Sequence, residues 1–189
     1  MPISGEKVLF FCGICYPFLS RKNNGRKEKT MKFKSLMHVS FFTEQMDVIR
    51  DFYENKLGME AKMVVRYKRY KGRLDKKWGR RAETDPEGIC LIYYEVAPGQ
   101  FIEFFPKAEG QGPHIVANQN VGYSHFSLLV EDIYAAREEL LALGIPLDED
   151  VSKGRAETYK MWIHDPDGNK IEVMQFTENS EQLKGSAER

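Results

Sequence analysis

Two histidines and two glutamates stand at matching places in a pattern that the chain contains twice. The first copy opens at His38 and closes at Glu103, and the second opens at His125 and closes at Glu172. Each histidine begins a short, mostly apolar run, and each glutamate ends a Gly-x-x-Ile-Glu segment. Two imidazoles and two carboxylates form a ligand set for a divalent first-row metal. The repeat therefore predicts two similar modules and one kind of metal site.

Alternation along the predicted strands indicates which side chains share a face with these residues. In the first strand, His38, Ser40 and Phe42 lie on one face, and the apolar residues between them suit packing under a helix. A charged glutamate among mostly hydrophobic neighbours needs a partner or a metal. The alternative is two ordinary His–Glu pairs inside a sheet, but the same pair at matching places in two repeats favours the metal.

The elements expected for the two copies follow one order. For the first copy they are a strand over 34–42, a helix with Thr43 as N-cap and Gly58 at its end, a strand over 60–67, and a hairpin of 88–96 and 100–106. For the second they are a strand over 122–130, a helix from Asp132 to Gly144, a short strand over 146–152, and a hairpin of 157–164 and 169–176. The prediction is an α+β fold of two βαβββ modules, which form a cupped eight-stranded sheet around the metal site.

The domain boundaries follow from these elements. Module 1 covers 31–106, module 2 covers 121–177, a linker covers 107–120, and a polar, frayed tail covers 178–189. The copies differ mainly in a basic insertion over 66–86. This insertion contains nine lysines and arginines, Arg80 and Arg81 among them. It is interpreted either as a lid that draws an anionic substrate toward the site or as a solvated loop.

Bulk composition restricts the function classes. The 189 residues have a formal net charge of zero, but residues 1–30 alone carry +4. Nothing in this balance indicates a nucleic-acid binder. Three cysteines are too few for a disulfide framework, which favours a cytoplasmic protein, and Cys90 fits a buried strand position. The remaining histidines, His114 and His164, fit solvated loops.

The first thirty residues have three interpretations. The apolar run over 8–19 is too short to span a bilayer, so no membrane association is expected from it. Residues 1–30 are interpreted as a translated leader ahead of Met31, as a disordered tail, or as a targeting segment.

Paired βαβββ modules with one metal ligand on the first and last strand of each resemble the vicinal oxygen chelate superfamily. The resemblance covers about residues 34–177, and its most typical motif is the segment from Asp165 to Glu172, Asp-Pro-Asp-Gly-Asn-Lys-Ile-Glu. The superfamily includes glyoxalase I, methylmalonyl-CoA epimerase, extradiol dioxygenases, fosfomycin-resistance thiol transferases and bleomycin-binding proteins. The set His38, Glu103, His125, Glu172 looks most like glyoxalase I. An epimerase, an extradiol dioxygenase and a non-catalytic drug-binding protein of the same fold are the alternatives.

The resemblance implies a reaction, a cofactor and an assembly. The reaction is a lyase or isomerase step on a hemithioacetal-type small molecule, with proton transfer next to a carbonyl and a metal that polarises vicinal oxygens. Glu172 stands at the position of the family's base, with Glu103 as the second candidate. One divalent metal per site is implied, and zinc, nickel, cobalt, manganese and iron all remain open. Family members commonly form homodimers whose sites combine ligands from two chains.

The resemblance also indicates which thiol would form the hemithioacetal substrate. Glutathione-dependent members usually have arginine four residues after the first ligand and asparagine four residues after the second, and here these positions hold Phe42 and Lys107. Phenylalanine offers no donor to a glutathione carboxylate, whereas arginine forms a bidentate pair. The sequence therefore predicts a substrate site that includes Phe42, Lys107, Arg80 and Arg81 and that is not optimised for glutathione.

Overall fold

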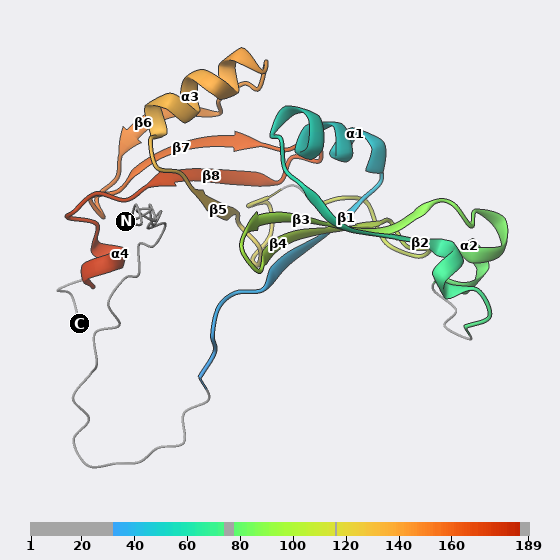
Figure 1. Cartoon of the computed structure of the whole chain (residues 1–189). Helices are drawn as coiled ribbons and strands as arrows, with labels where there is room; N and C mark the ends of the chain where they lie inside the picture. Colours follow the sequence, from blue (N-terminus) through green and yellow to red (C-terminus); the bar gives the residue numbers. More distant parts are fainter. Residues whose placement is uncertain (1–31, 74–77, 116, 186–189) are drawn as a thin grey trace, which may run out of the picture. The chain divides into compact units, whose positions relative to one another are not determined.

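The computed structural model describes residues 32–73, 78–115 and 117–185 (Figure 1). The leader interpretation of residues 1–30 lies outside these ranges. The described strands form two four-stranded mixed sheets, with the orders β1-β4-β3-β2 and β5-β8-β7-β6. The α+β fold of two βαβββ modules is thereby confirmed, and its eight strands are divided equally between two sheets rather than joined in one.

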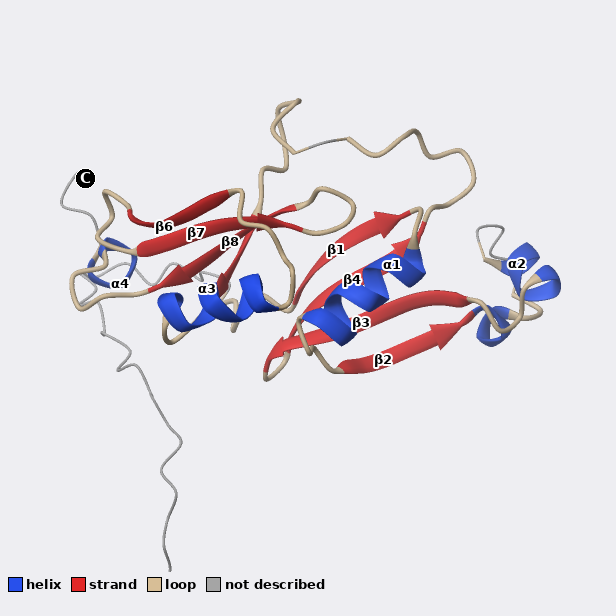
Figure 2. Ribbon diagram, turned by 90° about the horizontal axis from the view of Figure 1, so that it is seen from above, coloured by secondary structure: helices blue, strands red, loops and turns tan. Residues whose placement is uncertain are grey.

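The first module follows the predicted order, with strands β1 (His38–Thr43), β2 (Ala61–Arg66), β3 (Ile89–Ala97) and β4 (Gln100–Pro106). Its helix is α-helical over α1 (Met46–Arg50) and a π-helix over η1 (Asp51–Lys56). Gly58 has a φ of +64° directly beyond it, a conformation that glycine adopts without strain. Figure 2 shows α1 lying across one face of this sheet.

The second module repeats the arrangement, with strands β5 (Phe126–Leu129), β6 (Glu149–Lys153), β7 (Tyr159–His164) and β8 (Lys170–Gln175). Helix α3 (Ile133–Ala142) begins as predicted at Asp132, whose carboxylate accepts hydrogen bonds from the amides of Tyr134 and Ala135. Two free backbone donors are satisfied in this way, which stabilises the first turn.

Two local predictions are wrong. Thr43 does not cap the first helix: the N-cap residue is Gln45, and the Thr43 hydroxyl accepts a hydrogen bond from the Gln45 amide. The hydroxyl thus closes a tight turn between β1 and α1, a common alternative to capping for threonine. His164 ends β7 instead of lying in a loop, although its side chain is exposed as predicted, and its Nδ1 lies 2.7 Å from the Asp148 carboxylate.

The basic insertion has more structure than a solvated loop requires. It contains a 3-10 turn, η2 (Tyr67–Tyr70), and a short helix, α2 (Gly79–Thr84). A small second core holds these elements against the sheet through the buried side chains of Tyr67, Trp78, Ala82, Cys90 and Ala108. Burial of Cys90 agrees with its predicted strand position.

The polar tail is also more ordered than its composition predicts. Residues Glu181–Lys184 form the short helix α4. The buried Ser180 hydroxyl lies 3.0 Å from the Thr158 hydroxyl, which also donates to the Gln182 side chain at 2.8 Å. These hydrogen bonds fasten the described part of the tail to the turn before β7. No helix in the described ranges has the length and apolar character needed to cross a membrane.

One hydrophobic core runs through both modules, and polar contacts cross between them. The core includes Ile49 and Phe104 from the first module and Ile133 and Met161 from the second. The buried Tyr53 hydroxyl donates to Asp165 Oδ2 at 3.1 Å. Burial, followed by the Asp165 carboxylate, raises the pKa of Tyr53, so the hydroxyl remains a donor.

Replacement of Tyr53 by phenylalanine tests this contact between the modules. Tyr53→Phe keeps the ring in place but removes a donor to the buried Asp165 carboxylate, which should lower stability by about 1–2 kcal/mol. The expected fall in melting temperature is roughly 2–8 °C. The control is Tyr134→Phe, since Tyr134 is 57% exposed. Equal melting temperatures for the two variants would contradict this role of Tyr53.

Candidate metal centre

His38 and Glu103 lie on the first and last strand of module 1, Glu172 lies on the last strand of module 2, and His125 directly precedes β5. The first and last strands of each module are direct neighbours. Strand β1 pairs with β4 in parallel, with Ser40 opposite Glu103. Strand β5 pairs with β8 in parallel, with Ser127 opposite Glu172. In both modules the histidine stands two residues before the serine, so its side chain shares a sheet face with the glutamate.

The two histidines reach their glutamates at similar distances. His38 Nε2 lies 3.6 Å from Glu103 Oε2, and His125 Nε2 lies 3.4 Å from Glu172 Oε2. With bonds of about 2.0–2.1 Å, two ligands of one divalent ion are separated by roughly 3.0–3.5 Å. The donor set suits two ligands of one ion in each module; the His125–Glu172 distance lies within this range and the His38–Glu103 distance is 0.1 Å above it. We call each pair a half-site.

Neighbouring side chains hold the two glutamates in different ways. The Tyr93 hydroxyl, from β3, donates to the Glu103 carboxylate; burial, and then this hydrogen bond, raise the pKa of Tyr93 to about 12. Glu172 instead accepts a hydrogen bond from the Ser127 hydroxyl at 3.0 Å. The Glu103 side chain is 6% exposed and that of Glu172 is 12% exposed. Glu103 is thus the more deeply held carboxylate.

An aromatic ring supports each histidine from the same position in its sheet. The Tyr93 ring meets the His38 ring edge to face at 5.6 Å, and the Trp162 ring meets the His125 ring at 4.8 Å. Tyr93 is the β3 partner of Glu103, and Trp162 is the β7 partner of Glu172. The sequence analysis missed both aromatics. An alignment of the two copies from their closing glutamates backwards through the hairpin could have found them.

The described residues of one chain do not bring the four ligands together. No group of three or more metal-binding side chains occurs among them. A cavity of about 370 Å³ is bordered by residues of β1, β3, β4 and β5 and by His125, directly before β5. His38 also borders this cavity, but neither Glu103 nor Glu172 does. The first strand of each module, β1 or β5, lies at a sheet edge. Each half-site therefore offers two donors and needs further ligands to hold an ion firmly.

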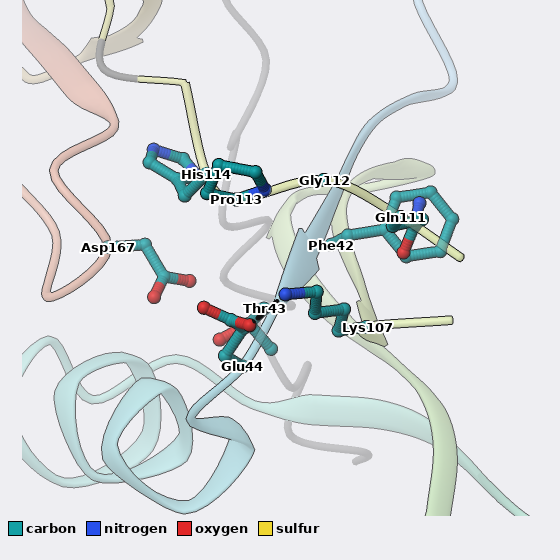
Figure 3. A pocket seen from close by; sticks show the side chains of 9 residues that line it. All are labelled: Phe42, Thr43, Glu44, Lys107, Gln111, Gly112, Pro113, His114 and Asp167. Carbon is teal, nitrogen blue, oxygen red and sulfur yellow. Dashed lines mark hydrogen bonds and ion pairs between the residues drawn. The ribbon is translucent and has the colours of Figure 1, made fainter. Parts of the chain in front are cut away.

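Phe42 and Lys107, predicted to contact the substrate, line one pocket of about 290 Å³ (Figure 3). Phe42 stands four residues after His38 on the same face of β1, roughly 13 Å along the strand. The Lys107 ammonium forms an ion pair with the Glu44 carboxylate. Asp167, from the turn between β7 and β8, lines the other side of the pocket. The positive charge of Lys107 is therefore already compensated.

The two arginines named from the insertion have local partners. The Arg80 guanidinium lies 2.6 Å from the Glu109 carboxylate, with both side chains largely exposed. Arg81 donates to the Tyr67 hydroxyl at 2.6 Å and to the Lys107 carbonyl at 2.9 Å. Arg81 therefore fastens the insertion to the end of β4, and neither arginine lines the pocket that contains Phe42.

The family model for the Glyoxalase/Bleomycin resistance protein/Dioxygenase superfamily matches residues 35–173. The chain belongs to this superfamily. The matched region includes both half-sites. Superfamily members commonly use a divalent metal, and the group contains enzymes as well as non-catalytic proteins. No curated protein matches the chain.

Several solved structures share the fold at low identity. The glyoxalase family protein from Enterococcus faecalis is 21% identical, with a TM-score of 0.57, over 76% of this chain and 99% of that one. SMU.1112c is 23% identical, with a TM-score of 0.56, over 76% and 99%. Lactoylglutathione lyase from Agrobacterium tumefaciens is 19% identical, with a TM-score of 0.50, over 77% and 96%. At these identities the likeness establishes the fold alone.

Trp162 offers a direct optical test of the second half-site. The sequence contains two tryptophans, and the Trp162 ring lies 4.8 Å from the His125 ring. Binding of Co²⁺ or Ni²⁺ by His125 should quench Trp162 fluorescence. Trp78→Phe should keep this quenching, and His125→Ala should abolish it. Full quenching in the His125→Ala variant would show that the metal binds elsewhere.

Proposed function

We propose that the protein is a metal-dependent enzyme of the glyoxalase I type, a lyase or isomerase that moves a proton next to a carbonyl in a small vicinal-oxygen substrate. The observation that carries the proposal is the matched pair of half-sites, each with a histidine nitrogen and a glutamate oxygen less than 4 Å apart. A binding protein has no need for this donor set at equal register in both modules. His38, Glu103, His125 and Glu172 are the proposed metal ligands.

The two candidate glutamates are proposed to have different roles in the reaction. When bound, a divalent ion polarises the vicinal oxygens of the substrate and makes the neighbouring C–H more acidic. Glu172 is the proposed base: it takes the proton from one carbon and returns it to the next. Glu172 suits this role because its only described hydrogen-bond donor is the Ser127 hydroxyl, which rotates easily. Glu103, held by Tyr93 and more deeply buried, is proposed to remain a fixed ligand.

We propose that a complete site needs two copies of the chain. His38 and Glu103 of one chain would join His125 and Glu172 of another, which gives a twofold homodimer with two sites. Support comes from the separation of the ligand pairs within one chain and from their position at open sheet edges, which tend to acquire partners.

Glutathione is proposed to be a poor co-substrate. Phe42 lacks a donor for a carboxylate, and Lys107, which lines the same pocket, already pairs with Glu44. Loss of one charge-assisted contact costs about 1.5–3 kcal/mol, or roughly one to two decades in affinity. A smaller or uncharged thiol adduct is the proposed substrate. An epimerase, an extradiol dioxygenase and a non-catalytic binding protein of the same fold remain the alternative functions.

The decisive assay measures isomerisation of methylglyoxal hemithioacetals made from glutathione and from several smaller thiols, after metal analysis. We expect turnover with at least one adduct and a lower efficiency with the glutathione adduct. Glu172→Gln, which keeps the shape of the side chain but removes the base, should reduce kcat by roughly 10²–10⁴-fold. Metal-loaded protein without turnover on any adduct would contradict the enzyme proposal, and oxygen uptake with a catechol would favour the dioxygenase.

Complementation between variants tests the shared site. Glu103→Ala and His125→Ala should each be inactive and bind little metal, because every site of either homodimer lacks one ligand. A mixed dimer restores one site with all four ligands, so mixing should recover up to about half of the wild-type activity per mixed dimer. The matched control mixes Glu103→Ala with His38→Ala; both changes affect the same half-site, so no complete site can form. Recovery in the control mixture, or none in the first, would contradict sharing.

A further inference from the structure

A cavity of about 390 Å³ at the outer edge of the first sheet has a strongly basic lining. Its charged residues are Arg50, Arg66, Lys68 and Arg69, and no acidic residue lines it. Val64, Val65 and Ile89 supply the apolar remainder of the lining. The volume lies within the range of about 300–1,000 Å³ that small-molecule sites occupy.

Two of the four cations have no carboxylate partner among the residues that the structure describes. Arg66 donates to the Glu87 backbone carbonyl, which does not neutralise its charge. Arg69 makes no ion pair in the described ranges. Lys68 and Arg50 do have partners, but the Lys68–Glu87 pair is more than half exposed and therefore weak. The guanidinium groups of Arg66 and Arg69, without a carboxylate partner in the described ranges, make this cavity a local centre of positive potential.

The cavity is separate from the proposed metal centre. Strand β2 forms one edge of the sheet, and β1, which carries His38, forms the other (Figure 2). Three strand spacings, roughly 14 Å, separate these edges. Arg50 comes from α1, whose Ile49 packs with Val39 and Phe41 on the face of β1 opposite His38. A ligand here would therefore not contact the half-sites of the same chain.

We propose that this cavity binds a small organic phosphate, with the phosphate held by Arg66, Arg69 and Lys68 and the organic part lying against Val64 and Ile89. A phosphate dianion suits the site better than a carboxylate, because it carries more charge and offers three oxygens to the planar guanidinium groups. A nucleic-acid strand is a poorer fit, since residues 31–189 together carry a net charge of −4.

The test follows backbone amide signals by NMR in the metal-free full chain at low salt, so it does not depend on the proposed catalytic function. The probes are phenyl phosphate, inorganic phosphate, benzoate and a single-stranded oligonucleotide without a terminal phosphate. We expect saturable shifts in residues 64–69 and at Ile89. Phenyl phosphate should bind more tightly than inorganic phosphate, and inorganic phosphate more tightly than benzoate.

Charge-matched variants distinguish a specific phosphate site from non-specific electrostatic attraction to the protein. Arg66→Gln with Arg69→Gln should weaken phenyl phosphate binding by roughly tenfold or more, whereas Arg155→Gln with Lys184→Gln, which removes the same charge elsewhere, should change it by less than about twofold. Arg66→Lys with Arg69→Lys should weaken phenyl phosphate binding by an intermediate amount, because lysine keeps the charge but cannot form the bidentate contact of a guanidinium group. Equal weakening by both glutamine pairs, no saturable shift, or tighter binding of the oligonucleotide would overturn the proposal.

Discussion

Parallel pairing of the first and last strand in each module is the constraint on which the candidate centre depends. It sets Ser40 opposite Glu103 and Ser127 opposite Glu172, and each histidine then lies two residues away on the same face. A shift of one residue would turn either glutamate toward the hydrophobic core, where an unpaired carboxylate is costly. The helix of each module covers the opposite face, which leaves the ligand face open.

The two half-sites share a geometry but differ in how they are held. Tyr93 fixes Glu103 from the neighbouring strand, and the small Ser127 hydroxyl is the described donor to Glu172. In the proposed reaction this difference gives one carboxylate the role of a fixed ligand and the other the freedom to carry a proton. Proton transfer by a coordinating carboxylate requires such freedom, because a nearby dication lowers its basicity.

Much of the fold could be predicted from the sequence because the internal repeat predicts the same order of strands and helix in both modules. The helix ends at Gly58 and Gly144, the Asp132 cap and the β3–β4 hairpin are local signals, and each appears close to the predicted place. The repeat together with strand alternation predicted that each histidine and its glutamate would share a sheet face, and the two lie less than 4 Å apart in both modules. The contacts of Tyr93 and Trp162 were not predicted, since their role depends on pairing between strands rather than on spacing along one strand.

The insertion and the described part of the tail make contacts that were not predicted, for a related reason. Basic and polar composition indicated exposed segments, but Trp78 and Tyr67 in one and Ser180 in the other are buried against distant parts of the chain. Composition alone does not reveal such contacts. The same limit applies to the contacts by which Arg81 holds the insertion against the end of β4.

In the proposed assembly each half-site supplies two ligands, and two chains complete a site. The most direct measurement is native mass spectrometry of the metal-loaded protein, which reports chain number and bound ions together. The account predicts a dimer with two divalent ions, and a monomer, produced by dilution, without a tightly bound ion. A monomer that retains one tightly bound ion would contradict it.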